Sequence, residues 1–242
     1  MPTLESGATL GEVAGILHAA VVLGPAAWGR EPMPEAHMAA DIEDRLKSQL
    51  IELFRILHER KVPYVLVGGI AMLTYIEGRN TKHVDLVVSV ESLKAIPEIA
   101  IYDQNRDFAR GKFGELLVDF LFTNNPLFKL VQDKYSSTQR FLETDIRCAT
   151  IEGLIMLKLF ALPSLYRQGR GQRIGLYEND VYMLCELTRP SMEPLLLNLQ
   201  PFVDPGAMQE LTNIVGDIQR RIERVDRARA SGGGTDHPSL PE

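Results

Sequence analysis

Two acidic residues interrupt segments that are otherwise apolar and have the composition of buried strands. Asp85 lies in HVDLVV and Asp119 lies in LLVDFLF. Each must pair with a cation, bind a metal ion or lie at a strand edge, because burying an isolated charge is costly. If the two strands are neighbours, the carboxylates can converge on a divalent cation, which prefers oxygen ligands. The alternative is that both are ordinary aspartates at strand ends.

The residues around Asp85 suit phosphate chemistry. Gly68 and Gly69 follow an apolar strand and precede a short helical stretch, so the backbone there can approach a phosphate group closely. The alternative is a tight turn between strand and helix, since the GxxxxGK(S/T) and GxGxxG phosphate motifs are both absent. Strand alternation places His83 on the same face as Asp85. The glycine pair, the acid and the imidazole therefore define one candidate site.

Basic side chains accompany these residues. Arg79, Thr81 and Lys82 come just before HVD, and a cation beside a metal–carboxylate cluster suits a triphosphate. A solvated polar loop is the alternative. Lys158 interrupts a strongly apolar helical run, so its ammonium must reach solvent or find an anion. Asp180 comes at the start of the next predicted helix, where a role as N-cap explains it equally well.

The elements that must position these residues are predicted from the spacing of apolar side chains. Asp41–Lys61 repeats leucine and phenylalanine at three- and four-residue steps, with acids in the first turn, which predicts an amphipathic helix. Continuous apolar runs predict strands in a sheet that helices cover. These runs are VPYVLV (62–67), VDLVVSV (84–90), GELLVDFLF (114–122) and DIRCATI (145–151).

The second half of the chain is predicted to be helical, so the predicted class is α/β or α+β with a helical C-terminal extension. Helices are expected over IEGLIMLKLFAL (151–162), over YENDVYMLCELT (177–188) and from about Pro205 to Ala230. The expected divisions are an N-terminal extension over 1–40 with a short helix near Gly11–Leu23, a core over 41–150, a helical part over 151–230 and a flexible tail over 231–242.

The composition restricts the class of protein and its location. The chain has 242 residues, of which 45% are hydrophobic and 24% charged, as in soluble globular proteins. A net charge of −6 argues against a generally basic surface that coats nucleic acid. Cys148 and Cys185 lie in apolar segments and predict buried thiols in a reducing compartment. The apolar stretch 15–28 is too short to span a bilayer and lacks the basic residues of a secretory signal, so we expect a cytoplasmic protein without a membrane partner.

Arginines suggest a local contact with RNA. Arg167, Arg170 and Arg173 occur in a predicted polar loop, and QRRIERVDRARA places five arginines on the last helix. The alternative is a solvated helix with internal ion pairs, because acids are interspersed among these arginines.

The order of these motifs resembles the nucleotidyltransferase (polymerase-beta-like) fold. In that pattern a glycine pair follows a strand, and then come a helix, an R-x-T loop, an acid between apolar residues on a second strand and a single aspartate on a third. The downstream TIEGLIMLKL and ENDVYML look most like the AbiEii-type minimal nucleotidyltransferases, which include toxins of bacterial toxin–antitoxin and phage-defence systems. The resemblance covers about Asp41 to Leu187 and implies a mixed sheet flanked by helices.

The resemblance also implies an activity. Such enzymes use Mg²⁺ held by carboxylates to move a nucleoside monophosphate from a nucleoside triphosphate to an acceptor, here RNA (such as tRNA) or a protein hydroxyl, and an antitoxin is an implied partner. Asp85, Asp119 and Lys158 would be catalytic, and Asp85 and Asp119 would bind the metal. The residues that would contact the nucleotide are Gly68, Gly69, Arg79, Thr81, Lys158 and Asp180.

His83 departs from the family pattern, because it occupies the place of the first carboxylate of a D-x-D pair. An imidazole can ligate a metal, but Mg²⁺ favours oxygen ligands, whereas Mn²⁺ accepts nitrogen better. Three interpretations follow: an active enzyme with altered metal preference (Mg²⁺ or Mn²⁺, with His83 as a ligand), an enzyme that uses His83 as a base, or a catalytically degenerate module that binds nucleotide, RNA or a protein partner.

Overall fold

The computed structural model describes residues 35–76, 83–141 and 144–232. The chain divides into two compact units, with the boundary after Leu154. The helix predicted near Gly11–Leu23, the loop residues Arg79, Thr81 and Lys82, and the tail from residue 233 lie outside the described residues.

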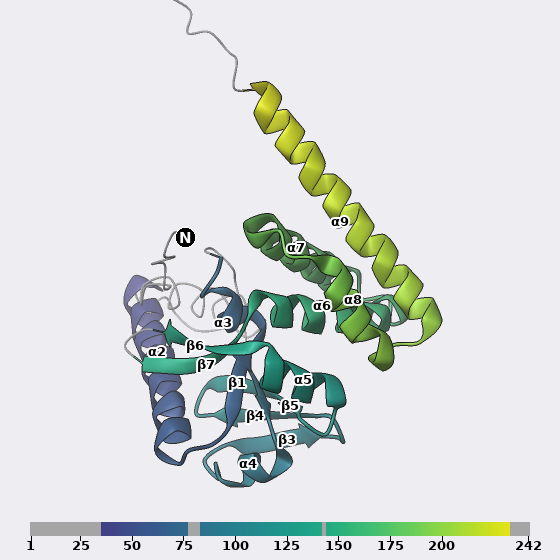
Figure 1. The fold of residues 1–242 in the computed structure, drawn as a ribbon. Helices are drawn as coiled ribbons and strands as arrows, with labels where there is room; N and C mark the ends of the chain where they lie inside the picture. The colour runs from purple at the N-terminus through teal and green to yellow at the C-terminus, as the bar shows by residue number, and fades with distance from the viewer. Residues whose placement is uncertain (1–34, 77–82, 142–143, 233–242) are drawn as a thin grey trace, which may run out of the picture. The chain divides into compact units, whose positions relative to one another are not determined.

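A mixed β-sheet forms the centre of the first unit (Figure 1), and its seven strands, counted over the described residues, have the order β3-β4-β5-β2-β1-β7-β6. β1 pairs with β7 and β2 pairs with β5 in parallel, and the other neighbouring pairs are antiparallel. The sheet and its flanking helices confirm the predicted fold class. The strands are β1 (Tyr64–Val67), β2 (Val84–Val88), β3 (Ala100–Gln104), β4 (Phe108–Phe113), β5 (Leu116–Phe122), β6 (Ser136–Phe141) and β7 (Thr144–Ala149).

The four predicted strands are β1, β2, β5 and β7, which lie inside the sheet rather than at its edges. Their apolar side chains are buried; Val65, Leu86 and Val118 have no exposed area. β5 alternates buried and half-buried residues along its length, so its two faces meet different surroundings. The continuous apolar runs of the sequence therefore correspond to strands in the interior of the sheet.

Three strands have no such signal and were not predicted. β3 is exposed along its whole length because it lies at one edge of the sheet. β4 alternates exposed and buried residues in FARGKF, with a glycine and two cations among them. β6 lies at the other edge and has the polar sequence SSTQRF. The edge strands β3 and β6 bury little apolar surface, and β4 buries only alternate residues, so apolar runs cannot reveal these three strands.

The amphipathic helix α2 runs over Glu35–Glu59 and begins earlier than the predicted Asp41, because EAHMAA consists largely of good helix formers. It ends before Lys61, which has a left-handed backbone with φ of 51°. The predicted apolar stripe is buried, and its members include Leu46, Leu50, Leu53, Phe54 and Leu57.

The described part of the first unit contains three shorter helices: α3 (Gly68–Met72), α4 (Val90–Lys94) and α5 (Pro126–Lys134). Ser89 accepts a hydrogen bond from the Ser92 backbone N–H at 3.0 Å and so begins α4. This cap ends β2 at Val88, two residues before the predicted end of that strand.

The second unit is helical and contains most of α6 (Ile151–Arg167), together with α7 (Gly171–Thr188), α8 (Met192–Leu199), the 3₁₀ turn η1 (Gln200–Phe202) and α9 (Pro205–Gly232). α7 begins at Gly171 rather than at the predicted Tyr177, so the expected polar loop is largely helical. α9 packs against α7 and α8 with buried residues at helical spacing, which are Leu211, Val215, Ile218 and Ile222. No described helix combines the length and the hydropathy that crossing a bilayer requires.

Both cysteines are buried and free of disulfide bonds, as their apolar segments predicted. Burial raises the pKa of the Cys148 thiol to about 12 and that of Cys185 to about 11, because the thiolate would lose its hydration. The thiols therefore behave as core residues.

Candidate active site

Asp85 and Asp119 lie side by side on neighbouring parallel strands. In the register of β2 with β5, Asp85 is the direct partner of Asp119. Paired residues of neighbouring strands point to the same face of the sheet, and the strands lie about 4.8 Å apart. Asp85 is half-buried near the start of β2, and Asp119 is half-buried in the interior of β5. The structure therefore brings together the two acids that the sequence singled out.

Gly68 makes room for the Asp85 carboxylate. Position 67 on β1 pairs with Asp85, so the first residue of α3 lies directly beside that side chain. A Cβ atom at position 68 would lie 2.0 Å from Asp85 Oδ2, and the backbone φ of +69° itself favours glycine. Glycine at this tight turn therefore leaves the space that the Asp85 carboxylate occupies. Gly69 is buried in the first turn of α3.

His83 contacts Asp119 rather than standing apart from the acids. Its Nδ1 lies 3.2 Å from Asp119 Oδ2, and both side chains are about one-third exposed. His83 comes immediately before β2, and alternation places it on the face of Asp85, as predicted. The imidazole therefore belongs to the same cluster as the two carboxylates.

Arg110 is a site residue that sequence reasoning missed. It lies on β4 as the register partner of Asp119, and its Nε is 3.8 Å from Asp119 Oδ1. On its other side its Nη1 is 3.6 Å from Asp103 Oδ2 on β3. Charged residues thus occupy consecutive partner positions across β2, β5, β4 and β3, in the order Asp85, Asp119, Arg110, Asp103. No signal in the sequence alone could have placed Arg110 opposite Asp119, because the register of β4 with β5 decides that pairing.

The donor set fits a divalent cation in its chemistry. Two carboxylates and one imidazole suit Mn²⁺, and two carboxylates suit Mg²⁺ when water completes its shell. Among the described residues, however, no group of three or more His, Cys, Asp or Glu side chains is arranged to hold a metal ion. In this arrangement Asp119 faces His83 and Arg110 instead. Metal binding by His83, Asp85 and Asp119 stays a prediction.

Lys158 and Asp180 pair with each other inside the second unit. Lys158 Nζ lies 2.8 Å from Asp180 Oδ2, and both side chains are buried. The ammonium also lies over the Tyr177 ring, 4.2 Å from its centroid. The predicted need of Lys158 for an anion is therefore met by Asp180. The interpretation of Asp180 as an N-cap is wrong, because α7 begins well before it. Nucleotide contacts by either residue stay a prediction.

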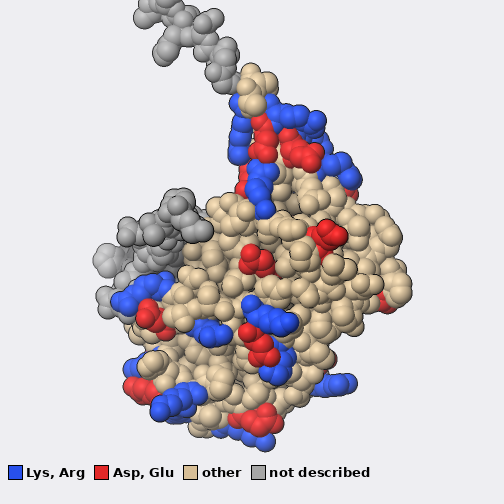
Figure 2. Space-filling view, viewed as in Figure 1, with Lys and Arg blue, Asp and Glu red and all other residues tan. Residues whose placement is uncertain are grey.

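Three arginines of the second unit have nearby acidic partners. Arg229 pairs with Glu186, Arg189 with Asp226, and Arg220 with Asp217. Figure 2 shows basic and acidic side chains interspersed along the outer part of α9. These contacts favour a solvated, ion-paired helix over a basic surface for RNA.

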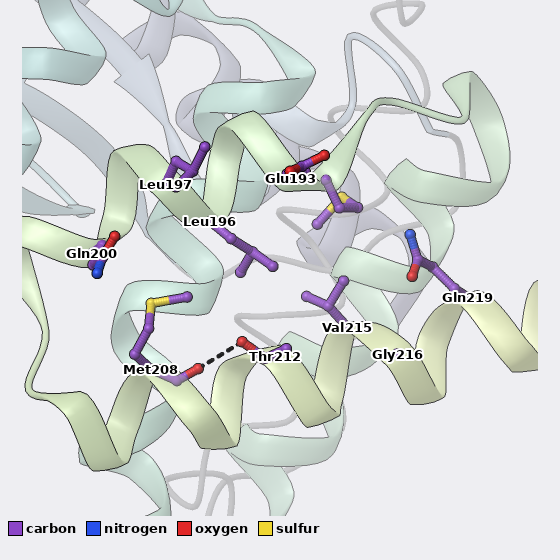
Figure 3. Close-up of a pocket in the computed structure, with 10 residues that line it drawn as sticks. Glu193, Leu196, Leu197, Gln200, Met208, Thr212, Val215, Gly216 and Gln219 are labelled. Carbon is purple, nitrogen blue, oxygen red and sulfur yellow. Dashed lines mark hydrogen bonds between the residues drawn. The ribbon is translucent and has the colours of Figure 1, made fainter.

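A separate groove of about 500 Å³ lies in the second unit between α8 and α9. Figure 3 shows Leu196 and Val215 pointing toward each other from the two helices, and Thr212 donating a hydrogen bond to the Met208 carbonyl. Glu193 is the one titratable residue among those that line it. The groove therefore lacks a cluster of titratable groups of the kind that acid–base catalysis uses.

Comparison with known proteins identifies the fold. No protein-family model matches the chain, and no curated protein matches it. The chain resembles the crystal structure of an antigenic nucleotidyltransferase-like protein from Paracoccidioides brasiliensis with a TM-score of 0.50 and 19% identity, over 76% of this chain and 92% of that one. It also resembles ANT(2'')-Ia in complex with adenylyl-2''-tobramycin, with a TM-score of 0.49 and 13% identity, over 69% of this chain and 96% of that one.

The likeness to the Paracoccidioides protein shows a nucleotidyltransferase-like fold, and that part of the expected resemblance is confirmed. Asp85, Asp119 and Gly68 lie within the sheet and turn of this fold. The narrower resemblance to the AbiEii-type group stays a prediction.

Proposed function

We propose that the protein is a metal-dependent nucleotidyltransferase that moves a nucleoside monophosphate from a nucleoside triphosphate to an acceptor. The observation that carries this proposal is the register pairing of Asp85 with Asp119 beside Gly68, whose missing side chain leaves space for the first carboxylate. A pair of aspartates on adjacent strands is costly without a cation between or beside them. The arrangement thus supports a centre that handles positive charge and phosphate.

Each part of the centre has a proposed task. Asp85 and Asp119 hold a divalent cation, Mg²⁺ or Mn²⁺, which supplies positive charge at the phosphate oxygens when it is bound. Gly68 and Gly69 let the backbone come close to the phosphates. His83 orients Asp119 through the 3.2 Å contact and is itself a candidate metal ligand.

The finer assignment rests on the sequence motifs. The AbiEii-type resemblance supports an RNA acceptor such as tRNA, or a protein hydroxyl, and a role in a toxin–antitoxin or phage-defence system. It also supports nucleotide contacts by Arg79, Thr81, Lys158 and Asp180.

A labelling assay tests the proposal. The protein is incubated with each α-labelled nucleoside triphosphate in Mg²⁺ or Mn²⁺, with total tRNA or with protein alone, and transfer to acid-insoluble material is measured. We expect transfer by the natural chain and its loss in Asp85→Asn and in Asp119→Asn. Asp133→Asn serves as a matched control, since Asp133 is an exposed α5 residue that pairs with Lys129. Transfer that survives both site substitutions would exclude this centre.

A catalytically degenerate binding module is the second candidate. It is favoured by His83, which stands where a carboxylate is expected and reduces the negative charge available to Mg²⁺. Such a module binds a nonhydrolysable nucleoside triphosphate in equilibrium dialysis but transfers no label. If His83→Asp alone produces transfer, the natural chain is the degenerate form.

A further inference from the structure

Arg110 has no task in the proposed reaction, yet it lies beside one of its two acids. Its side chain is 51% exposed, and its Nε lies 3.8 Å from Asp119 Oδ1. That carboxylate oxygen is shielded from solvent and accepts no hydrogen bond from the described residues. The guanidinium is therefore close enough to neutralise Asp119 without being hydrogen-bonded to it.

Asp103 is a second carboxylate beside the same guanidinium. Asp103 Oδ2 lies 3.6 Å from Arg110 Nη1 and belongs to the exposed edge strand β3. Arg110 thus lies between two carboxylates, one inside the site and one at its border. Because Arg110 lies near both carboxylates at once, at 3.8 Å from Asp119 and 3.6 Å from Asp103, a rotamer change can bring it closer to either one, at little cost in an exposed location.

We propose that Arg110 is an internal counter-cation of Asp119 that competes with the divalent cation, and that Asp103 receives the guanidinium when the cation binds. This inference rests on the proposed function, since it presumes a metal site at Asp85 and Asp119. A positive ion at Asp119 repels Arg110, and Arg110 in turn weakens the attraction of Asp119 for the ion. Arg110 is thus a positioning residue that limits metal affinity.

The inference predicts opposite effects from two substitutions. Arg110→Gln removes the competitor and should lower the Kd for Mn²⁺ about two- to fivefold, the range that exposed charge pairs give. Asp103→Asn removes the alternative partner and should raise that Kd. Arg110→Lys keeps the charge and should resemble the natural chain. In an Arg110→Gln background, Asp103→Asn should have almost no further effect, because the two residues act through one interaction.

The measurement is titration of the metal-free protein with Mn²⁺, with free Mn²⁺ followed by electron paramagnetic resonance and without any nucleotide. Lys112→Gln is the matched control: it removes the same charge from the same strand and face, but its register partner on β5 is Leu117 rather than Asp119. Circular dichroism and thermal unfolding confirm that each variant is folded.

The outcomes separate this inference from the proposed function. If the natural chain binds Mn²⁺ and Arg110→Gln binds it with equal or lower affinity, the inference is overturned while the metal site stands. If neither protein binds Mn²⁺, the inference and the metal site of the proposed function fail together. An equal effect of Lys112→Gln on the Kd for Mn²⁺ also overturns the inference, because the net charge of the protein would then explain the change.

Discussion

The Asp85 carboxylate lies in the space that a side chain at position 68 would occupy. A Cβ atom added at Gly68 would lie 2.0 Å from Asp85 Oδ2, and the Asp85 Cγ and Cβ atoms lie within 2.5 and 2.8 Å of the same point. The turn at Gly68 and the position of the Asp85 carboxylate therefore depend on each other, although they belong to different elements, α3 and β2.

Gly68→Ala should displace the Asp85 carboxylate and abolish label transfer. The backbone φ of +69° adds strain for any other residue, so we expect a loss of about 1–3 kcal/mol in the free energy of unfolding. Urea denaturation measures the loss. Gly175→Ala in α7 is the control, because nothing lies within 4 Å of its Cβ position and alanine should stabilise that helix by about 0.5–1 kcal/mol. Unchanged transfer in Gly68→Ala would contradict the role given to this turn.

The buried pair of Lys158 and Asp180 should behave as a unit in stability. Lys158→Met leaves the Asp180 carboxylate buried without its cation and should cost about 3–5 kcal/mol. The double variant Lys158→Met/Asp180→Leu should recover much of that loss, since no charge is then buried. Lys129→Met breaks the exposed pair with Asp133 and should cost less than about 1 kcal/mol. Chemical denaturation of the four proteins checks this, and a double variant less stable than the single one would contradict it.

His83→Asp should increase the response to Mg²⁺. The substitution places a third carboxylate beside Asp119, so repulsion should lower the melting temperature of the metal-free protein, and Mg²⁺ should raise it more than in the natural chain. His83→Asn is the matched control, because asparagine has nearly the shape of aspartate but no charge. Thermal unfolding with and without Mg²⁺ is the measurement. Equal shifts in the Asp and Asn variants would show that position 83 does not face a bound cation.

The two cysteines should not react with a thiol reagent in the folded protein. The raised pKa values of Cys148 and Cys185 keep both thiols protonated at pH 8, and both are buried. Ellman's reagent should therefore detect two thiols only after unfolding.

The same shifts predict alkaline destabilisation. A thiol whose pKa is higher in the folded state stabilises fully below the unfolded value of about 9, and this contribution is lost as the pH rises toward about 12. The free energy of unfolding should fall over this range, and Cys148→Ala should reduce the fall. Urea denaturation between pH 8 and 11 measures it, and identical pH profiles would contradict the cause.

The sequence was sufficient to single out the two acids and the glycine turn as candidate site residues. Each acid interrupts an apolar run, and the glycine pair ends one. A charge in VDLVV or LLVDFLF needs a partner whatever the topology, and that requirement can be inferred without coordinates. Arg110 could not be found in this way. Its importance comes from the pairing of β4 with β5, and an arginine in a polar segment has no special meaning until the register is known.

The helices and strands also divide into those that apolar spacing predicts and those that it does not. Four of the interior strands (β1, β2, β5 and β7) and the long helices follow from apolar spacing, whereas β3 and β6 lie at the edges and contain too little buried apolar surface to be recognised. The interior strand β4 was also missed, because it buries only alternate residues. Asp180 illustrates the difficulty at helix ends. The stretch GQRIGL (171–176) was predicted to belong to a polar loop, but it forms the first turns of α7. Asp180 is therefore an interior residue of that helix and not its cap.

The parallel pairing of β2 with β5 has a consequence for the order of folding. A parallel pair cannot be joined by a tight turn, and here the strands β3 and β4 lie between the two in the chain. During synthesis the turn at Gly68 and the strand with Asp85 leave the ribosome well before Asp119 does. A chain stopped before Leu116 can contain one half of the centre but not its partner, so metal affinity should arise only when β5 has docked.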